Sequence, residues 1–211
     1  SPWSLGVAAL AAQPLQSDAD RDLTVVPLIG YEGERVFLRG LTAGVRGGDR
    51  DGVNWRLQLQ PRMQTLEAGD APGLEGIRER KRALEAAVGV STGSAVWAPD
   101  LQLAVDVSNR HGGAEASVRW SLPLVRSAST RLALEPALRW QSTDLVDYYV
   151  GVDAGEARPG RSIHRAGPAL NPELALALQR RLAPDWSFNL RVAGAWLDDG
   201  IRESPLVDRS S

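Results

Sequence analysis

The stretch NWRLQLQPRMQT, residues 54–65, decides the fold class. Successive side chains of a β-strand point to opposite faces, so a period of two predicts a strand with two different faces. One face is apolar and consists of Trp55, Leu57, Leu59, Pro61 and Met63; the other is strongly polar and consists of Asn54, Arg56, Gln58, Gln60, Arg62 and Gln64. Pro61 has no amide donor and therefore fits poorly inside a hydrogen-bonded ladder.

The same alternation continues to the end of the chain and predicts about eleven strands. Besides 54–65, the predicted strands are 3–11, 23–31, 35–40, 41–47, 84–91, 101–108, 115–124, 131–141, 173–181 and 186–196. Residues 67–82 break the pattern with glycine, proline and the charged run Arg78-Glu79-Arg80-Lys81-Arg82. We interpret this segment as a solvated loop, in preference to a basic docking patch, because charge runs are common on surfaces.

Composition excludes several classes of protein. The 211 residues carry a net charge of −2 with a pI near 5.8, which provides no electrostatic footprint for nucleic acid. There is no cysteine, and the chain contains no run of 18 apolar residues, so the sequence predicts no transmembrane helix. The N-terminal SPWSLGVAAL lacks the basic and apolar regions of a signal peptide, so we expect that any signal peptide has already been removed.

Loop lengths and tryptophans favour a membrane barrel. The predicted connections at 126–130 and 183–185 are short, whereas those at 144–170 and 198–211 are long, as between the two ends of an outer-membrane barrel. Tryptophans concentrate at membrane interfaces, and Trp186 and Trp196 are about one tilted crossing apart. The predicted aromatic belts contain Trp3, Trp55 and Trp186 on the inner side of the membrane and Trp140 and Trp196 on the outer side.

The polar face suits a confined interior better than a water-covered surface. It mixes arginine and acids with many small residues, and Lys81 is the one lysine of the chain. Arginine suits paired interior networks better than lysine. The charges predicted to line the lumen are Arg56, Arg62, Glu85, Asp106, Glu115, Arg119, Arg131, Glu135, Arg139, Glu173, Arg181 and Arg191. A soluble lipocalin-like barrel, with its apolar face inside, is the alternative that alternation alone leaves open.

Candidate sites for chemistry are weak. His111 lies near Ser108 and Asp106 in sequence, but nothing places them as a catalytic triad, and His111 and His164 show no metal-ligand spacing. The glycine-containing run 151–161 lacks the Gly-Lys-Ser/Thr ending of a phosphate loop. We therefore expect no catalytic residues, no metal and no cofactor.

Four segments resemble the MipA/OmpV family of Gram-negative outer-membrane proteins. They are WSLGVAAL at 3–10, NRHGGAE at 109–115, YYVGVDAGEA at 148–157, and the segment 198–208 that ends in SPLVD. Each segment is a weak signal alone, but their order and spacing cover the whole chain.

The resemblance implies an all-β fold, an antiparallel up-and-down transmembrane β-barrel that forms one domain over residues 1–211. It implies about 12 strands when complete, with the last strand expected to be missing here, since bacterial barrels have even strand numbers. It also implies a scaffold that binds a lytic transglycosylase and a penicillin-binding protein of cell-wall metabolism, in contact with the lipid bilayer and lipopolysaccharide. A narrow porin-like channel is the alternative function.

Overall fold

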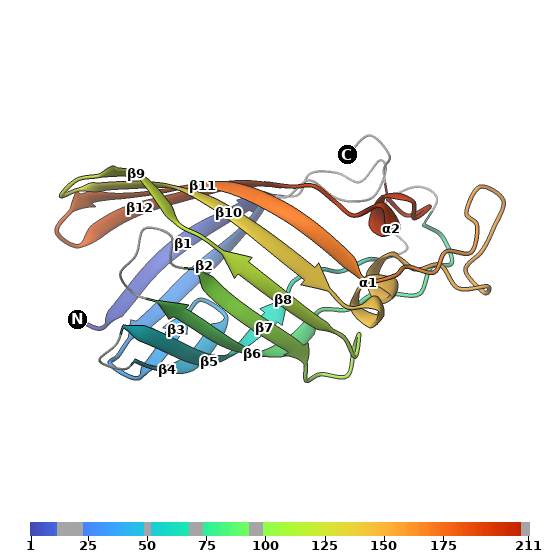
Figure 1. Ribbon diagram of the computed structural model, residues 1–211, viewed down its shortest axis with the longest axis horizontal. Helices are drawn as coiled ribbons and strands as arrows, with labels where there is room; N and C mark the ends of the chain where they lie inside the picture. The colour runs from blue at the N-terminus through green and yellow to red at the C-terminus, as the bar shows by residue number, and fades with distance from the viewer. Residues whose placement is uncertain (12–22, 49–51, 68–73, 93–98, 208–211) are drawn as a thin grey trace.

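One antiparallel sheet makes up most of the molecule. The computed structural model describes residues 1–11, 23–48, 52–67, 74–92 and 99–207. Figure 1 shows the sheet curling into a wall, with two short helices and the long loops gathered at one end. The strands are β1 (Trp3–Ala11), β2 (Leu23–Glu32), β3 (Val36–Arg39), β4 (Thr42–Gly48), β5 (Val53–Arg62), β6 (Ala83–Thr92), β7 (Asp100–Asp106), β8 (Ala114–Arg119), β9 (Leu122–Arg126), β10 (Thr130–Gln141), β11 (Ala169–Ala183) and β12 (Trp186–Ala195).

The strands follow each other in sequence order, which is the predicted up-and-down topology. Twelve strands occupy eleven positions, because β8 and β9 both pair with β10 along one line. The predicted single strand 115–124 is interrupted at Trp120 and Ser121, where the Trp120 amide still donates to the carbonyl of Pro136 at 3.0 Å. The fold class predicted from alternation is thus confirmed, and the interruption is a local irregularity of the wall.

The two outermost strands run in the same direction. Each antiparallel step reverses direction, and ten steps lead from β1 to β12. Among the described residues, no hydrogen-bonded pair joins β1 to β12. A fully antiparallel closure at this seam takes one strand that runs opposite to both, which would give the even strand number of bacterial barrels.

Strand register places the charges on one face of the wall and the large apolar residues on the other. Gln60 lies opposite Glu85, and Leu57 lies opposite Val88, so in these pairs a polar residue lies opposite a polar residue and an apolar residue opposite an apolar one across β5 and β6. We call the polar side the inner face and the apolar side the outer face. The outer face is exposed: Leu5, Leu57 and Leu190 are 84%, 53% and 48% accessible, which is the opposite of a soluble core.

Pro61 fits the ladder because its nitrogen lies on an unpaired edge. Successive residues of an antiparallel strand direct their backbone groups to opposite neighbours. The Leu84 carbonyl accepts from Val107, so Leu84 faces β7 and the next residue, Glu85, faces β5. Gln60, paired with Glu85, therefore faces β6, and Pro61 faces β4, beyond the last β4–β5 pair at Leu59.

The long loops fold into an ordered cap over one end of the wall. The cap comprises residues 63–67, 74–82, 142–168 and 197–207, and holds α1 (Thr143–Val150) and α2 (Asp199–Arg202). Its apolar side chains form two clusters, one around α1 and one between the three loops. The predicted loop 144–170 thus begins with a helix. No helix in the described part of the chain is long and apolar enough to cross a membrane.

Candidate functional site

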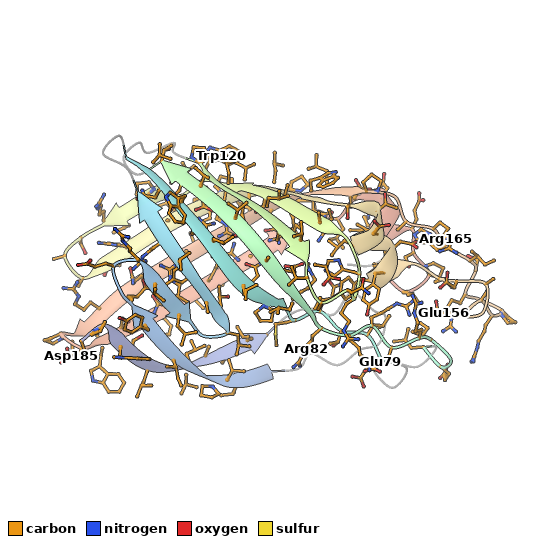
Figure 2. The ribbon with its side chains drawn as sticks, turned by 90° about the horizontal axis from the view of Figure 1, so that it is seen from below. Glu79, Arg82, Trp120, Glu156, Arg165 and Asp185 are labelled. Atoms are coloured by element: carbon orange, nitrogen blue, oxygen red, sulfur yellow. The ribbon has the colours of Figure 1, made fainter. Side chains whose placement is uncertain are left out.

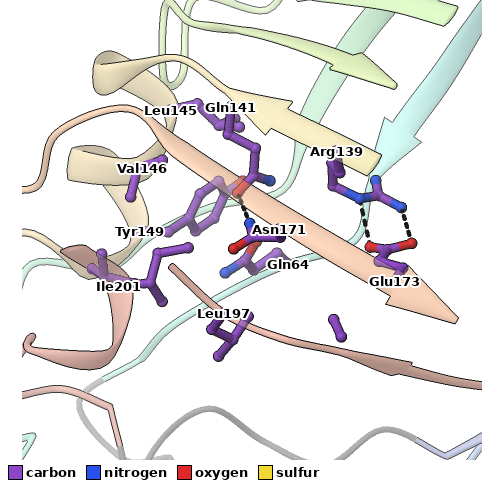
Figure 3. Close-up of a pocket in the computed structure, with 12 residues that line it drawn as sticks. Gln64, Arg139, Gln141, Leu145, Val146, Tyr149, Asn171, Glu173, Leu197 and Ile201 are labelled. Carbon is purple, nitrogen blue, oxygen red and sulfur yellow. Dashed lines mark hydrogen bonds and ion pairs between the residues drawn. The ribbon is translucent and has the colours of Figure 1, made fainter. Parts of the chain in front are cut away.

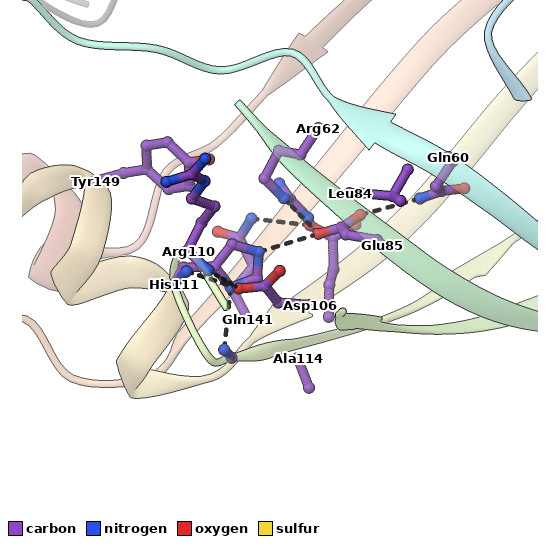
Figure 4. A network of polar contacts seen from close by, with 12 residues as sticks. Gln60, Arg62, Leu84, Glu85, Asp106, Arg110, His111, Ala114, Gln141 and Tyr149 are labelled. Atoms are coloured by element: carbon purple, nitrogen blue, oxygen red, sulfur yellow. Dashed lines mark hydrogen bonds and ion pairs between the residues drawn. The ribbon is translucent and has the colours of Figure 1, made fainter. Parts of the chain in front are cut away.

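Ion pairs cross the inner face directly beneath the cap. Arg62 on β5 contacts Glu85 on β6 at 2.6 Å and Glu115 on β8 at 2.7 Å. Gln60 also donates to Glu85, at 3.1 Å. Figure 4 shows Arg62, Glu85 and Gln60 converging from neighbouring strands. Both carboxylates are almost fully buried, so this pairing compensates charges that would otherwise be costly to remove from water.

Arg139 on β10 extends these ion pairs along the inner face from β8 to β11. Its guanidinium contacts Glu115 at 2.6 Å and forms a two-pronged pair with Glu173 on β11, at 2.7 and 3.0 Å (Figure 3). Glu115 therefore bridges Arg62 and Arg139. We call these five side chains the inner network: Arg62, Glu85, Glu115, Arg139 and Glu173.

Four more ion pairs of the described residues lie on the inner face, farther from the cap, and two of them join Glu32 to Arg39 and to Arg46, at 2.6 and 2.7 Å. Arg56 makes two hydrogen bonds of 2.6 Å to Asp100, and Arg191 contacts Glu135 at 3.1 Å. Sequence reasoning placed Asp100 in a loop and missed it. It begins β7, and its register opposite the inner-face Arg119 brings its carboxylate to Arg56.

Four of the predicted charges have no ion pair with any described residue: Asp106, Arg119, Arg131 and Arg181. Asp106 instead organises the turn after β7. Its carboxylate accepts the backbone N–H groups of Ser108, Arg110, His111 and Gly112 at 2.6–2.9 Å. Gly112 has a φ of +63°, which favours glycine. The segment NRHGGAE, residues 109–115, which resembles the family, thus lies in this turn and at the start of β8.

His111 is buried and belongs to this polar structure. Its Nδ1 accepts from the Gly113 amide at 3.0 Å, and its Nε2 lies 3.4 Å from Glu85. The Ser108 hydroxyl donates to Asp106 and accepts from the Leu84 amide. Ser108 and His111 thus have separate partners and form no triad, and His164 lies elsewhere, against the Gly200 carbonyl. Within the described residues, no cluster of three histidines or acids offers a metal site.

The cap contains a buried ion pair that sequence reasoning missed. Arg80 is 1% accessible and donates to both oxygens of Glu156, at 2.9 and 3.0 Å. The interpretation of 78–82 as a solvated loop is therefore wrong for Arg80, although Glu79 and Lys81 are exposed (Figure 2 labels Glu79, Arg82 and Glu156 at this end). Burial alone would raise the pKa of Glu156, but hydrogen bonds from Arg80 and from two backbone amides lower it to about 2.

A cavity of about 190 Å³ separates α1 from the inner network. Figure 3 shows Leu145 and Tyr149 of α1 on one side and Arg139 and Glu173 on the other. Burial raises the pKa of Tyr149 to about 12, so this phenol stays neutral.

The five belt tryptophans all lie on the outer face, 42% to 73% accessible. Trp3, Trp55 and Trp186 stand near the starts of strands that run toward the cap, and Trp140 and Trp196 stand at the ends of such strands. Trp3 also packs on Tyr31, with ring centroids 4.8 Å apart. Two tiers of aromatic residues around an apolar band match the interfaces of a bilayer.

An antiparallel wall with an apolar outer face, aromatic tiers and a charged inner face defines a bacterial outer-membrane β-barrel protein. The family described as "MltA-interacting protein MipA" matches residues 5–211, and the chain belongs to this family of Gram-negative outer-membrane proteins.

Curated relatives agree with this placement. The chain is 26% identical to "MltA-interacting protein" of Escherichia coli (strain K12), over 99% of this chain and 85% of the relative. It is 23% identical to "Outer membrane protein OmpV" of Vibrio cholerae and 22% identical to "Outer membrane protein Omp26La" of Vibrio anguillarum, each over 99% of this chain and 82% of the relative. No solved structure matches the chain.

Proposed function

We propose that this chain is a single-domain outer-membrane barrel that acts as a scaffold in cell-wall metabolism. The partner we propose is a lytic transglycosylase of the MltA type, by analogy with the relative from Escherichia coli that is named for that interaction. A penicillin-binding protein is a second proposed partner, which rests on family resemblance. None of the relatives' names denotes an enzyme, and we propose no catalytic role.

One observation favours a scaffold over a channel. The inner network joins β5, β6, β8, β10 and β11 by ion pairs of 2.6–2.7 Å directly beneath the capped end. Charges that pair across a narrow interior fill it, and a narrow barrel has little space left for solute. We therefore propose that the twelve predicted charges mainly fill and brace a lumen, and that the five belt tryptophans anchor the barrel in lipid.

Unpaired arginines on the inner face support a channel as the second candidate function. Arg119, Arg131 and Arg181 lie on the inner face without an ion pair to any described residue, and the last two are exposed. Unpaired arginines would favour anions in a pore. The proposed contact with lipopolysaccharide would involve exposed cations of the cap, such as Arg82.

The decisive experiment combines binding and conductance. The purified protein is immobilised in lipid nanodiscs, and binding of the lytic transglycosylase from the same cell is measured by interferometry; in parallel, single-channel conductance is recorded in planar bilayers. The scaffold predicts saturable binding and no steady conductance. An ion-selective conductance without transglycosylase binding would reject the scaffold in favour of the channel.

A further inference from the structure

The wall contains a notch between β2 and β5. The β3–β4 hairpin between these strands is short and turns at Gly40 and Leu41, well before the capped end. The last hydrogen bond between β2 and the hairpin runs from the Gly40 amide to the Ile29 carbonyl, at 3.0 Å. Beyond that turn, no described residue pairs with the edge of β2 that faces away from β1. The β4–β5 ladder likewise ends at Leu59, before β5 reaches Arg62.

Both edges of the notch lie in the apolar band. Val25 and Ile29 on β2 are 60% and 48% accessible on the outer face, and Leu41 at the hairpin tip is 69% accessible. On the other edge, Leu59 and Met63 are 48% and 43% accessible. No described strand lies between β2 and β5 in this part of the wall, and the distance from β2 to β5 corresponds to three strand spacings, a width of about 14 Å.

Proline stands on each edge of the notch. Because Ile29 directs its carbonyl toward β3, Pro27 two residues earlier faces the same side, and Pro61 faces the notch from β5. Unpaired N–H groups are costly in hydrocarbon, and proline has none. Two prolines at these positions reduce the cost of an open edge and at the same time disfavour pairing with a further strand.

The inner side of the notch is amphipathic. Val26 and Leu28 of β2 and Leu10 of β1 place apolar side chains on the inner face, whereas Gln60 and Arg62 of β5 present polar groups across the gap. The edge carbonyls of the notch keep their acceptor capacity, since proline removes only the donor. A molecule with an alkyl chain and a donor-bearing head fits both sides.

We propose that this notch is a lateral portal, through which an amphiphile from the membrane reaches the inner face. The ligand class is a single alkyl chain with a hydroxyl or amine head. Its chain lies on Val26 and Leu28, and its head donates to the edge carbonyls of the notch. The portal differs from the scaffold role, because its apolar side and its edge carbonyls belong to the wall and not to the cap, and Arg62 is the one residue that the polar side of the notch shares with the inner network.

The test uses the absence of native cysteine, which makes a single introduced thiol unique. Val26→Cys places the thiol on the inner face beside the notch. The matched control is Ala133→Cys, on the inner face of β10 between its partners on β9 and β11. Both variants are reconstituted in vesicles and treated with N-dodecylmaleimide, which partitions into the bilayer, or with a charged, water-soluble maleimide.

The portal predicts that N-dodecylmaleimide modifies Val26→Cys about tenfold faster than Ala133→Cys, since paired strands separate the control from lipid. Dodecanol should slow the modification of Val26→Cys, whereas methyl laurate, which has no donor, should not. Equal rates at the two positions would overturn the portal. Protection of Val26→Cys from both reagents would also overturn the portal, because another segment of this protein or a strand of a partner would then fill the notch.

Discussion

Arg80 and Glu156 lie 76 positions apart in the chain, yet the buried guanidinium of Arg80 donates hydrogen bonds to both carboxylate oxygens of Glu156. Arg80 also donates to the carbonyl of Gly151, at the end of α1. Arg161, in turn, donates to the backbone carbonyl of Glu156 at 2.8 Å. This pair therefore joins the loop after β5 to the loop after α1.

Glu156→Gln should open the cap. The substitution leaves the Arg80 charge buried without its counter-ion, and breaking a buried pair typically costs about 3 kcal/mol or more. Trypsin cleavage within residues 74–82 measures the open population, which should rise about 100-fold since each 1.4 kcal/mol is a factor of ten.

The control is Glu79→Gln, which removes an exposed pair with Lys81, 51% accessible on each side. Exposed pairs contribute little, so cleavage of this variant should match the native chain. Equal cleavage of the two variants would show that Arg80 and Glu156 do not hold the cap.

Acid should loosen the same contact. The pKa of Glu156 is lowered from 4.5 to about 2 in the folded protein. A carboxyl with a depressed pKa contributes stability above its unfolded pKa, and this contribution is lost as the pH falls through the folded value. Pepsin cleavage of the cap, normalised at each pH to the cleavage of an unfolded substrate, should therefore rise between pH 4.5 and 2, in Glu79→Gln as in the native chain. The Glu156→Gln variant should lack that rise, and the same rise in it would assign the transition to another group.

Alternation alone predicted the wall but not the contacts that complete it. The period-two patterns in residues 54–65 and 131–141 predict each strand, the face on which each side chain lies, and the approximate bounds of the strand. They do so because one face of the wall must be apolar toward lipid and the other polar toward the interior. Arg80 carries no such local signal: exposed and buried arginines look alike in a charged run. Its burial depends on Glu156, which the topology brings near. Asp100 was missed because a strand boundary is uncertain by a few residues.

The segment that became α1 shows a different limit. Residues 144–170 were predicted as a loop since strand alternation had stopped, yet Leu145, Val146, Tyr149 and Val150 recur with helical spacing and are buried together. A helical period over so short a stretch is a weak signal, and the apolar face of α1 is buried by residues distant in sequence, namely Ala166, Ala169, Ile201 and Val207.

The aromatic tiers predict a depth-dependent fluorescence signal. In bilayers of lipids brominated near the carbonyl groups, native tryptophan emission should be quenched more strongly than with bromines at the chain ends, because interfacial rings lie at the headgroup level. Trp186→Phe and Trp196→Phe should each remove part of the quenched emission. Stronger quenching by the deep bromines would place these side chains in the hydrocarbon and contradict the two tiers.

Arg139 and Arg191 offer a matched comparison for the filled interior. Both are inner-face arginines on long strands, but Arg139 binds two acids with 29% of its side chain accessible, and Arg191 binds one acid with 42% accessible. Arg139→Ala leaves Glu173 without a counter-ion in a buried network and should lower the free energy of unfolding in detergent by about 3 kcal/mol. Arg191→Ala should lower it by less than about 1 kcal/mol.

If the inner network fills the lumen, Arg139→Ala should also produce a conductance that the native protein lacks. Unchanged stability together with an altered conductance in both variants would mean that the arginines line an open pore instead of bracing a closed one.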